Sequence, residues 1–155
     1  MKLVATTLLD AARTTVAAVL ALLLARILKL PEFYWAPISA IVIIQSTIDP
    51  KTLAWQRFAG TALGAALGAL IATVFTAPWA HTWVYAGTIF LCGVLCVLLR
   101  FRGAYRFAGI TVSIVLLIAH TRPAWIVALH RFVEVSIGIA VALTIALIWP
   151  IKSDS

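Results

Sequence analysis

Charged side chains occur within the long apolar stretches of this chain, where a charge is costly. Asp10 precedes Arg13 by three residues. Arg131 precedes Glu134 by the same spacing, which in a helix places both members of a pair on one face. An ionised residue at the bilayer centre costs about 2.5–3.5 kcal/mol, so such residues normally pair, face a bundle interior or line water. Two interpretations stay open: each pair neutralises itself and orients its helix, or it lines a path on which an anion meets the arginine.

A third arginine begins a stripe of glycines. Gly60, Gly64 and Gly68 recur at every fourth residue, a spacing that lets another helix approach closely in lipid. Arg57 lies seven residues before Gly64 and therefore on the same helix face. We expect the three glycines to be helix-packing positions and Arg57 to face the bundle or a partner.

Other polar residues could belong to the same interior. Gln45 and Thr61 supply neutral hydrogen-bonding groups, whose alternative role is to bond one helix to another. Arg106 belongs to a basic cluster that would anchor the topology, contact anionic headgroups or concentrate anions at a pore mouth. The candidate pathway residues are Arg57, Thr61, Arg131, Glu134, Arg13, Asp10, Gln45 and Arg106.

The composition identifies the solvent in which these residues must be placed. Of the 155 residues, 64% are hydrophobic and 11% are charged, against about 45–50% and about 25% in ordinary soluble domains. A chain this short cannot hide so much apolar surface from water, so its solvent must be mainly lipid. The formal charge of +7 is scattered between apolar runs, which favours a cytoplasmic bias over a nucleic-acid partner.

Long runs rich in Ala and Leu, ended by prolines, predict an all-α polytopic membrane protein. We expect one transmembrane domain, residues 1–150, with a short cytoplasmic tail at residues 151–155. Its six-helix transmembrane bundle would comprise residues 3–30, 33–48, 55–77, 82–99, 107–121 and 124–149. Placing both termini in the cytoplasm gives that side eight basic residues and the other side four, as the positive-inside rule requires.

Aromatic residues support these boundaries. All six tryptophans lie at or near the expected helix ends, as an interfacial aromatic belt requires. They are Trp35, Trp55, Trp79, Trp83, Trp125 and Trp149.

Catalytic and metal chemistry find little support. The five acidic residues include no close pair, and the three histidines lack a zinc-protease spacing. Cys92 and Cys96, one helical turn apart in an apolar run, are interpreted as packing residues. We therefore expect no enzyme activity, no metal and no cofactor.

Several motifs together resemble those of the fusaric acid resistance (aromatic acid exporter, FUSC) family. They are Tyr34-Trp-Ala-Pro-Ile-Ser, the short loop Asp49-Pro-Lys, Arg57-x-x-Gly60-Thr61-x-x-Gly64-x-x-x-Gly68, Arg106-x-x-Gly109-Ile-Thr111 and Arg131-x-x-Glu134-x-x-x-Gly138. The same six-helix unit distantly resembles plant aluminium-activated malate transporters, which are dimeric anion channels. The resemblance implies a multi-pass protein of the bacterial inner membrane that moves organic or aromatic carboxylates outward. By carry-over, Arg57, Thr61, Arg131 and Glu134 would be pathway residues, and Gly60 and Gly64 packing positions.

Larger members of that family carry two membrane halves and a cytoplasmic region, whereas this chain has one half. We therefore expect a homo-oligomer, most simply a dimer, with membrane lipid and small organic anions as partners. The alternative is a non-transporting scaffold or accessory subunit of a larger transport complex, in which the charges only hold helices together. A membrane-embedded enzyme is a third and weaker interpretation.

Overall fold

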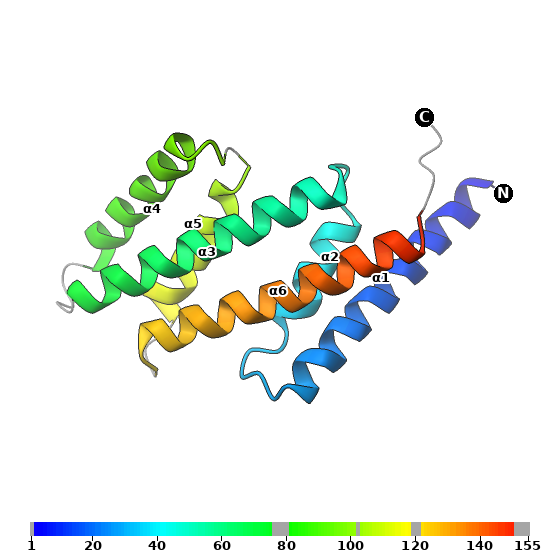
Figure 1. The fold of residues 1–155 in the computed structure, drawn as a ribbon, viewed down its shortest axis with the longest axis horizontal. Helices are drawn as coiled ribbons and strands as arrows, with labels where there is room; N and C mark the ends of the chain where they lie inside the picture. The colour runs from blue at the N-terminus through cyan, green and yellow to red at the C-terminus, as the bar shows by residue number, and fades with distance from the viewer. Residues whose placement is uncertain (1, 76–80, 102, 119–121, 151–155) are drawn as a thin grey trace. The chain divides into compact units, whose positions relative to one another are not determined.

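The computed structural model describes residues 2–75, 81–101, 103–118 and 122–150, with side chains from Thr7 onward except those of His81 and Ile118. These residues form six α-helices and no strand (Figure 1), so the predicted helix number and order are confirmed. The elements are α1 (Lys2–Ile27), α2 (Trp35–Ile44), α3 (Pro50–Val74), α4 (His81–Leu98), α5 (Tyr105–Ser113), the π-helical turn η2 (Ile114–Ile118) and α6 (Ala124–Ile148).

One difference from the predicted boundaries is at the start of α3, and another is the predicted helix at residues 107–121, whose α-helical part ends at Ser113 and continues as η2. Helix α3 begins at Pro50, five residues before the predicted start, so Pro50 and Lys51 of the expected loop belong to its first turn. Asp49 Oδ2 accepts hydrogen bonds from Thr52 N at 2.9 Å and Thr52 Oγ1 at 3.1 Å. Asp49 is therefore an N-cap, and a proline in the first helical position lacks only an N–H that the helix does not use.

The six helices differ in their ability to cross a membrane. Residues 7–27, 50–74 and 124–148 are each long and apolar enough to do so. The other three are apolar but shorter, and α2, with 10 residues, is only about 15 Å long at about 1.5 Å per residue. Six full spans were expected, and among the described residues three helices are long enough to be such spans. The predicted tail at 151–155, Trp79 and residues 119–121 lie outside the described residues.

By its packing the chain divides into two compact units. Unit 1 comprises Met1–Ala54 and Glu134–Ser155, and unit 2 comprises Trp55–Val133. In unit 1, α1 packs against α2, and both helices bury small side chains as close helix contacts in lipid require. The fully buried alanines are Ala17, Ala21, Ala25, Ala36 and Ala40.

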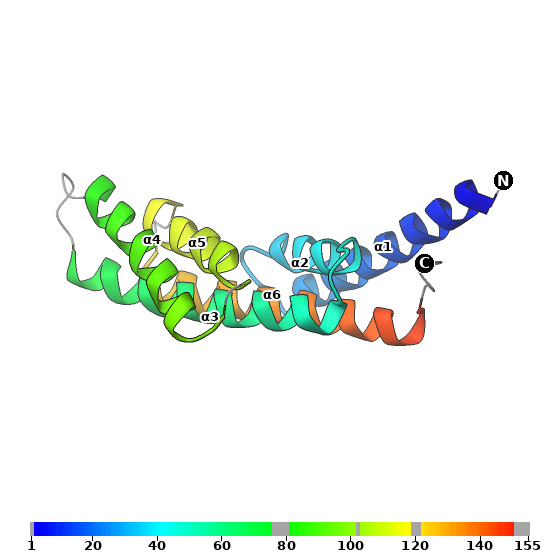
Figure 2. The same cartoon turned by 90° about the horizontal axis from the view of Figure 1, so that it is seen from above.

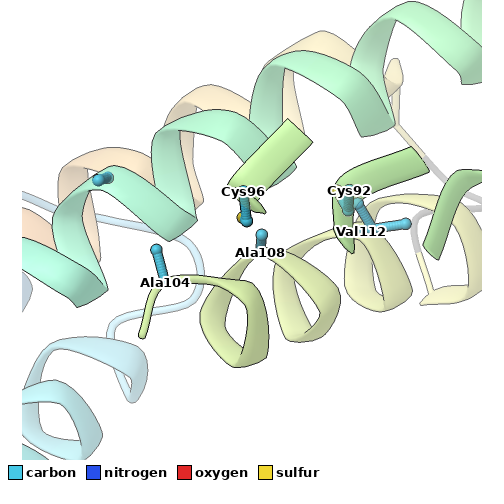
Figure 3. Close-up of a cluster of buried hydrophobic side chains, with 6 residues drawn as sticks. Cys92, Cys96, Ala104, Ala108 and Val112 are labelled. Carbon is cyan, nitrogen blue, oxygen red and sulfur yellow. The ribbon is translucent and has the colours of Figure 1, made fainter. Parts of the chain in front are cut away.

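In unit 2, α4 and α5 lie side by side, as the two views in Figures 1 and 2 show. A buried apolar cluster forms where they meet. Its members are Ala59, Cys92, Cys96, Ala104, Ala108 and Val112 (Figure 3). Cys92 and Cys96 are free thiols, and they act here as small apolar side chains of the helix contact.

The glycines of α3 lie against α5 and η2 within unit 2. A Cβ added at Gly60 would overlap the carbonyl oxygen of Ala104, and one at Gly64 would overlap that of Ala108. A Cβ at Gly68 would lie 3.0 Å from Cβ of Val115. Only hydrogen fits at Gly60 and Gly64, because the atoms opposite are backbone and cannot rotate away.

Candidate anion site

Three of the predicted pathway arginines gather in unit 2, although they come from three helices. Arg57 of α3 is 5% exposed and Arg131 of α6 is 1% exposed, whereas Arg106 of α5 is exposed. The charges of Arg131 and Arg106 both act on Arg57. The tertiary structure thus brings together cations that are 49 and 74 residues away from Arg57 in the chain.

Aromatic rings accompany these arginines. The guanidinium carbon of Arg57 lies 5.0 Å from the centre of the Phe107 ring, and that of Arg106 lies 4.8 Å from the same centre. Both distances are within the range of a cation–π interaction. Phe58 and Phe132, each following an arginine, have ring centroids 5.0 Å apart. The site therefore combines guanidinium groups with apolar aromatic surface.

Thr61, one turn after Arg57 on α3, is buried in the same unit. A guanidinium presents a planar fork of N–H donors that matches a carboxylate, and its weak hydration suits a buried position. Two guanidiniums within electrostatic range of each other can both attract the same anion. This arrangement can bind an organic anion, with phenylalanine rings available to an apolar or aromatic body.

Glu134 lies in unit 1 and is fully buried. Its Oε1 accepts a hydrogen bond from the backbone N–H of Glu32 at 3.0 Å. Trp35 Nε1 in turn donates to Glu32 Oε2 at 3.0 Å. Glu134 thus holds the turn that leads into α2, a structural role that the sequence prediction did not include. The boundary between the two units falls between Arg131 and Glu134.

The remaining predicted residues also lie in unit 1. Gln45 Nε2 donates to Thr14 Oγ1 at 2.6 Å, which joins the end of α2 to α1. Thr14 itself donates to the backbone carbonyl of Asp10 at 2.8 Å. Arg13 is 9% exposed, and its Nε has no hydrogen-bond partner among the described residues. In this unit, then, the structure places Gln45 in a helix-to-helix hydrogen bond.

The phenylalanines of the site were missed by the sequence prediction. A partial signal was present, because the dipeptide Arg-Phe occurs four times, at residues 57–58, 100–101, 106–107 and 131–132, and three of these arginines are the ones that gather. Within the described residues, no group of three or more His, Cys, Asp or Glu could hold a metal ion.

The long apolar helices and buried arginines define a helical membrane protein. The model of the fusaric acid resistance protein-like family matches residues 19–145, and the chain belongs to this family. The match includes all three arginines of the candidate site.

Two curated relatives carry the name uncharacterized transporter YdhK. The protein of Salmonella typhimurium LT2 is 34% identical over 154 residues, which cover 93% of this chain and 22% of the relative. That of Escherichia coli K12 is 33% identical over 155 residues, which cover 94% of this chain and 23% of the relative. The chain therefore spans less than a quarter of the length of these relatives. No solved structure matches the chain.

Proposed function

We propose that this chain forms a path for organic anions, aromatic carboxylates among them, across the bacterial inner membrane in the outward direction. Arg57 and Arg131 would bind the carboxylate, and Arg106 would draw anions toward them. The observation that carries the proposal is the gathering of these three arginines in unit 2, with two of them almost wholly buried. Membership of the family and the transporter names of the relatives support the transport part of the proposal.

Passage requires that the anion is held well enough to enter and weakly enough to leave. The arginines replace part of the hydration of the carboxylate. Two guanidinium groups within range of the same carboxylate also both attract its negative charge. The rings of Phe58, Phe107 and Phe132 offer contact to the rest of the molecule. We further propose that the chain works as a homo-oligomer, most simply a two-fold dimer.

A second candidate function is a non-transporting scaffold or accessory subunit. The observation that favours it is the hydrogen bond from Glu32 N to Glu134, because this buried acid holds two segments together. A scaffold would show no anion flux, and its arginines would affect only the stability of the fold.

The test is the flux of benzoate through proteoliposomes that contain the full chain. Arg57→Ala and Arg131→Ala should each reduce flux at least about tenfold, since each removes a charged partner of the carboxylate. The matched control is Arg26→Ala, because Arg26 is an exposed arginine that also lies 5.0 Å from a phenylalanine ring, that of Phe33. It should leave flux unchanged. Wild-type flux in folded Arg57→Ala and Arg131→Ala would reject the proposal and favour the scaffold.

A further inference from the structure

The ends of α1 and α4 have the same unusual backbone. Lys29 has a φ of 53° and Arg100 a φ of 60°, and they are the two non-glycine residues with positive φ in the described chain. Each residue follows a helix and serves as its left-handed cap. The same hydrogen bond closes both turns, from Leu30 N to Ala25 O at 3.1 Å and from Phe101 N to Cys96 O at 2.8 Å. The two turns are 71 residues apart.

The buried faces of α1 and α4 match at the same offset. In each helix three small residues, spaced by four, have almost no exposed surface. They are Ala17, Ala21 and Ala25 in α1, and Thr88, Cys92 and Cys96 in α4. Adding 71 to each number of the first set gives the second set.

The short helices α2 and α5 also have equivalent residues, in this case 72 residues apart in the chain. Ser39 Oγ donates to the carbonyl of Trp35 at 2.8 Å, and Thr111 Oγ1 donates to the carbonyl of Phe107 at 2.9 Å. The turns that precede these helices also agree, since Trp35 N donates to Glu32 O and Phe107 N to Ala104 O, both at 3.0 Å.

The long helices α3 and α6 match at an offset of 74, which pairs Gly64 with Gly138. In unit 2, Gly64 of α3 lies against Ala108 O and Thr111 Cβ of α5. In unit 1, Gly138 of α6 lies against Ala36 O and Ser39 Cβ of α2. The residues contacted are themselves equivalent at the offset of 72. Gly64 and Gly138 are therefore equivalent contact residues: α3 packs through Gly64 on α5, and α6 packs through Gly138 on α2.

Two apolar grooves repeat this relationship. In unit 2 a groove of about 200 Å³ is lined by Ile71 of α3 and Leu91 of α4. In unit 1 a groove of about 330 Å³ is lined by Ile145 of α6 and Leu20 of α1. The four residues are equivalent in pairs at the offsets of 74 and 71.

We infer that α1–α3 and α4–α6 are two copies of one three-helix fold, and that their equivalent arginines, Arg57 and Arg131, bind a single anion between them. Equivalent residues that touch each other lie at a two-fold axis. Phe58 and Phe132 are equivalent and are in contact, and each directly follows one of the two arginines. The charge of Arg131 reaches Arg57 in the same unit. A carboxylate offers one oxygen to each guanidinium in such an arrangement.

The shared anion site rests on the proposed function, whereas the repeat does not. An odd number of helices in each copy gives the two copies opposite orientations. Transporters built in this way place their substrate site where the repeats meet.

The first test uses the reciprocity that a two-fold axis imposes. Ala62 and Ala128 line one groove of about 360 Å³ in unit 2. At the offset of 74, Ala62 is equivalent to Ser136 and Ala128 is equivalent to Ala54, and both of these residues lie in unit 1. With Cys92→Ala and Cys96→Ala as background, Ala62→Cys/Ala128→Cys and Ala54→Cys/Ser136→Cys should be cross-linked to a similar extent by a bifunctional thiol reagent. The background variants are suitable because the equivalent residues of α1 are Ala21 and Ala25.

Register-shifted pairs serve as controls for the cross-linking. Ala62→Cys/Val127→Cys and Ala54→Cys/Ile137→Cys should react far less than the two reciprocal pairs. Cross-linking of the Ala62 pair without the Ala54 pair would overturn the repeat, whatever the transport activity.

The second test measures equilibrium binding of labelled benzoate to the purified chain. One benzoate should bind per chain. Arg57→Lys and Arg131→Lys should each weaken its affinity about tenfold and to a similar extent, because each takes away one half of the same bidentate contact. The double variant should lose less than the product of the two single losses, since both residues act on one ligand.

Two bound benzoates per chain, or losses that multiply, would overturn the shared site. Failure of the proposed function would look different. In that case flux would be absent, or present and unaffected by either arginine variant, while the cross-linking result would still decide whether the chain is a repeat.

Discussion

The ring of Phe58 lies 5.0 Å from the ring of Phe132, and each of these residues directly follows an arginine in its helix. The contact joins α3 to α6 within unit 2. It also brings Arg57 and Arg131, which are 74 residues apart in the chain, within electrostatic range of each other. The ring contact therefore joins the two helices directly beside their arginines.

The ring of Phe107 should help to position the guanidinium groups of Arg57 and Arg106, which both lie against it. Phe107→Leu keeps a buried apolar side chain but removes cation–π contacts worth about 0.5–2 kcal/mol each. We expect benzoate flux to fall several-fold while the protein stays folded. Phe33→Leu, which removes the ring beside Arg26, is the control and should leave flux unchanged. Equal flux in both variants would show that the ring of Phe107 does not position Arg57.

The glycine contact between α3 and α5 should be intolerant of a single methyl group. Gly64→Ala places a Cβ against the carbonyl oxygen of Ala108, and such overpacking costs about 1–3 kcal/mol. The free energy of unfolding, measured by denaturant titration in detergent, should fall by this amount.

The control for this prediction is in α4. A Cβ at Gly87 meets nothing within 4 Å, so Gly87→Ala should be neutral or stabilise the helix by about 0.5–1 kcal/mol. Gly138→Ala should behave like Gly64→Ala, because it meets backbone at Ala36. Loss of stability in Gly87→Ala alone would contradict the packing described here.

Glu134 should be required as a hydrogen-bond acceptor. Glu134→Ala leaves the part-buried N–H of Glu32 without the acceptor that it has at 3.0 Å, at a cost of about 1–3 kcal/mol. Glu134→Gln retains an oxygen in this position and should unfold nearer to the wild type. If the two variants are equally unstable, the charge of Glu134 rather than its acceptor atom holds the turn before α2.

The cap of α3 should make a part of the stability depend on pH. The backbone N–H of Thr52 donates to Asp49 and holds the pKa of this carboxyl below its usual 3.8. Because the pKa is lower in the folded state, the stabilisation is complete above the ordinary pKa and is lost as pH falls through the folded pKa. Thermal unfolding of the wild type should therefore shift to lower temperature below about pH 4 by this contribution.

Asp49→Asn is the control for the pH prediction, because asparagine also caps helices but does not titrate in this range. It should be less sensitive to acid than the wild type. A wild type and an Asp49→Asn variant with the same acid dependence would place the titrating group elsewhere.

The fold class and several features of the site could be predicted from the sequence. Apolar content and proline positions are local properties, and they were sufficient for six helices in the correct order. The fourfold spacing of Gly60, Gly64 and Gly68 marked the face of α3 that lies against α5 and η2. The start of α3 was misplaced because Pro50 was interpreted as part of a loop. In the structure Pro50 is the first residue of the helix, and Asp49 is its N-cap.

Membrane solvent, helix order and the residues that carry charge within apolar segments were thus determined by the sequence itself, because hydropathy and spacing act over one or two helical turns. Only the tertiary structure decided that Arg57, Arg106 and Arg131 meet around phenylalanine rings, and that Glu134 accepts a hydrogen bond from the N–H of Glu32. The reason is physical. The helical period predicts which residues share a face, but which helix packs against that face depends on segments that are distant in the chain.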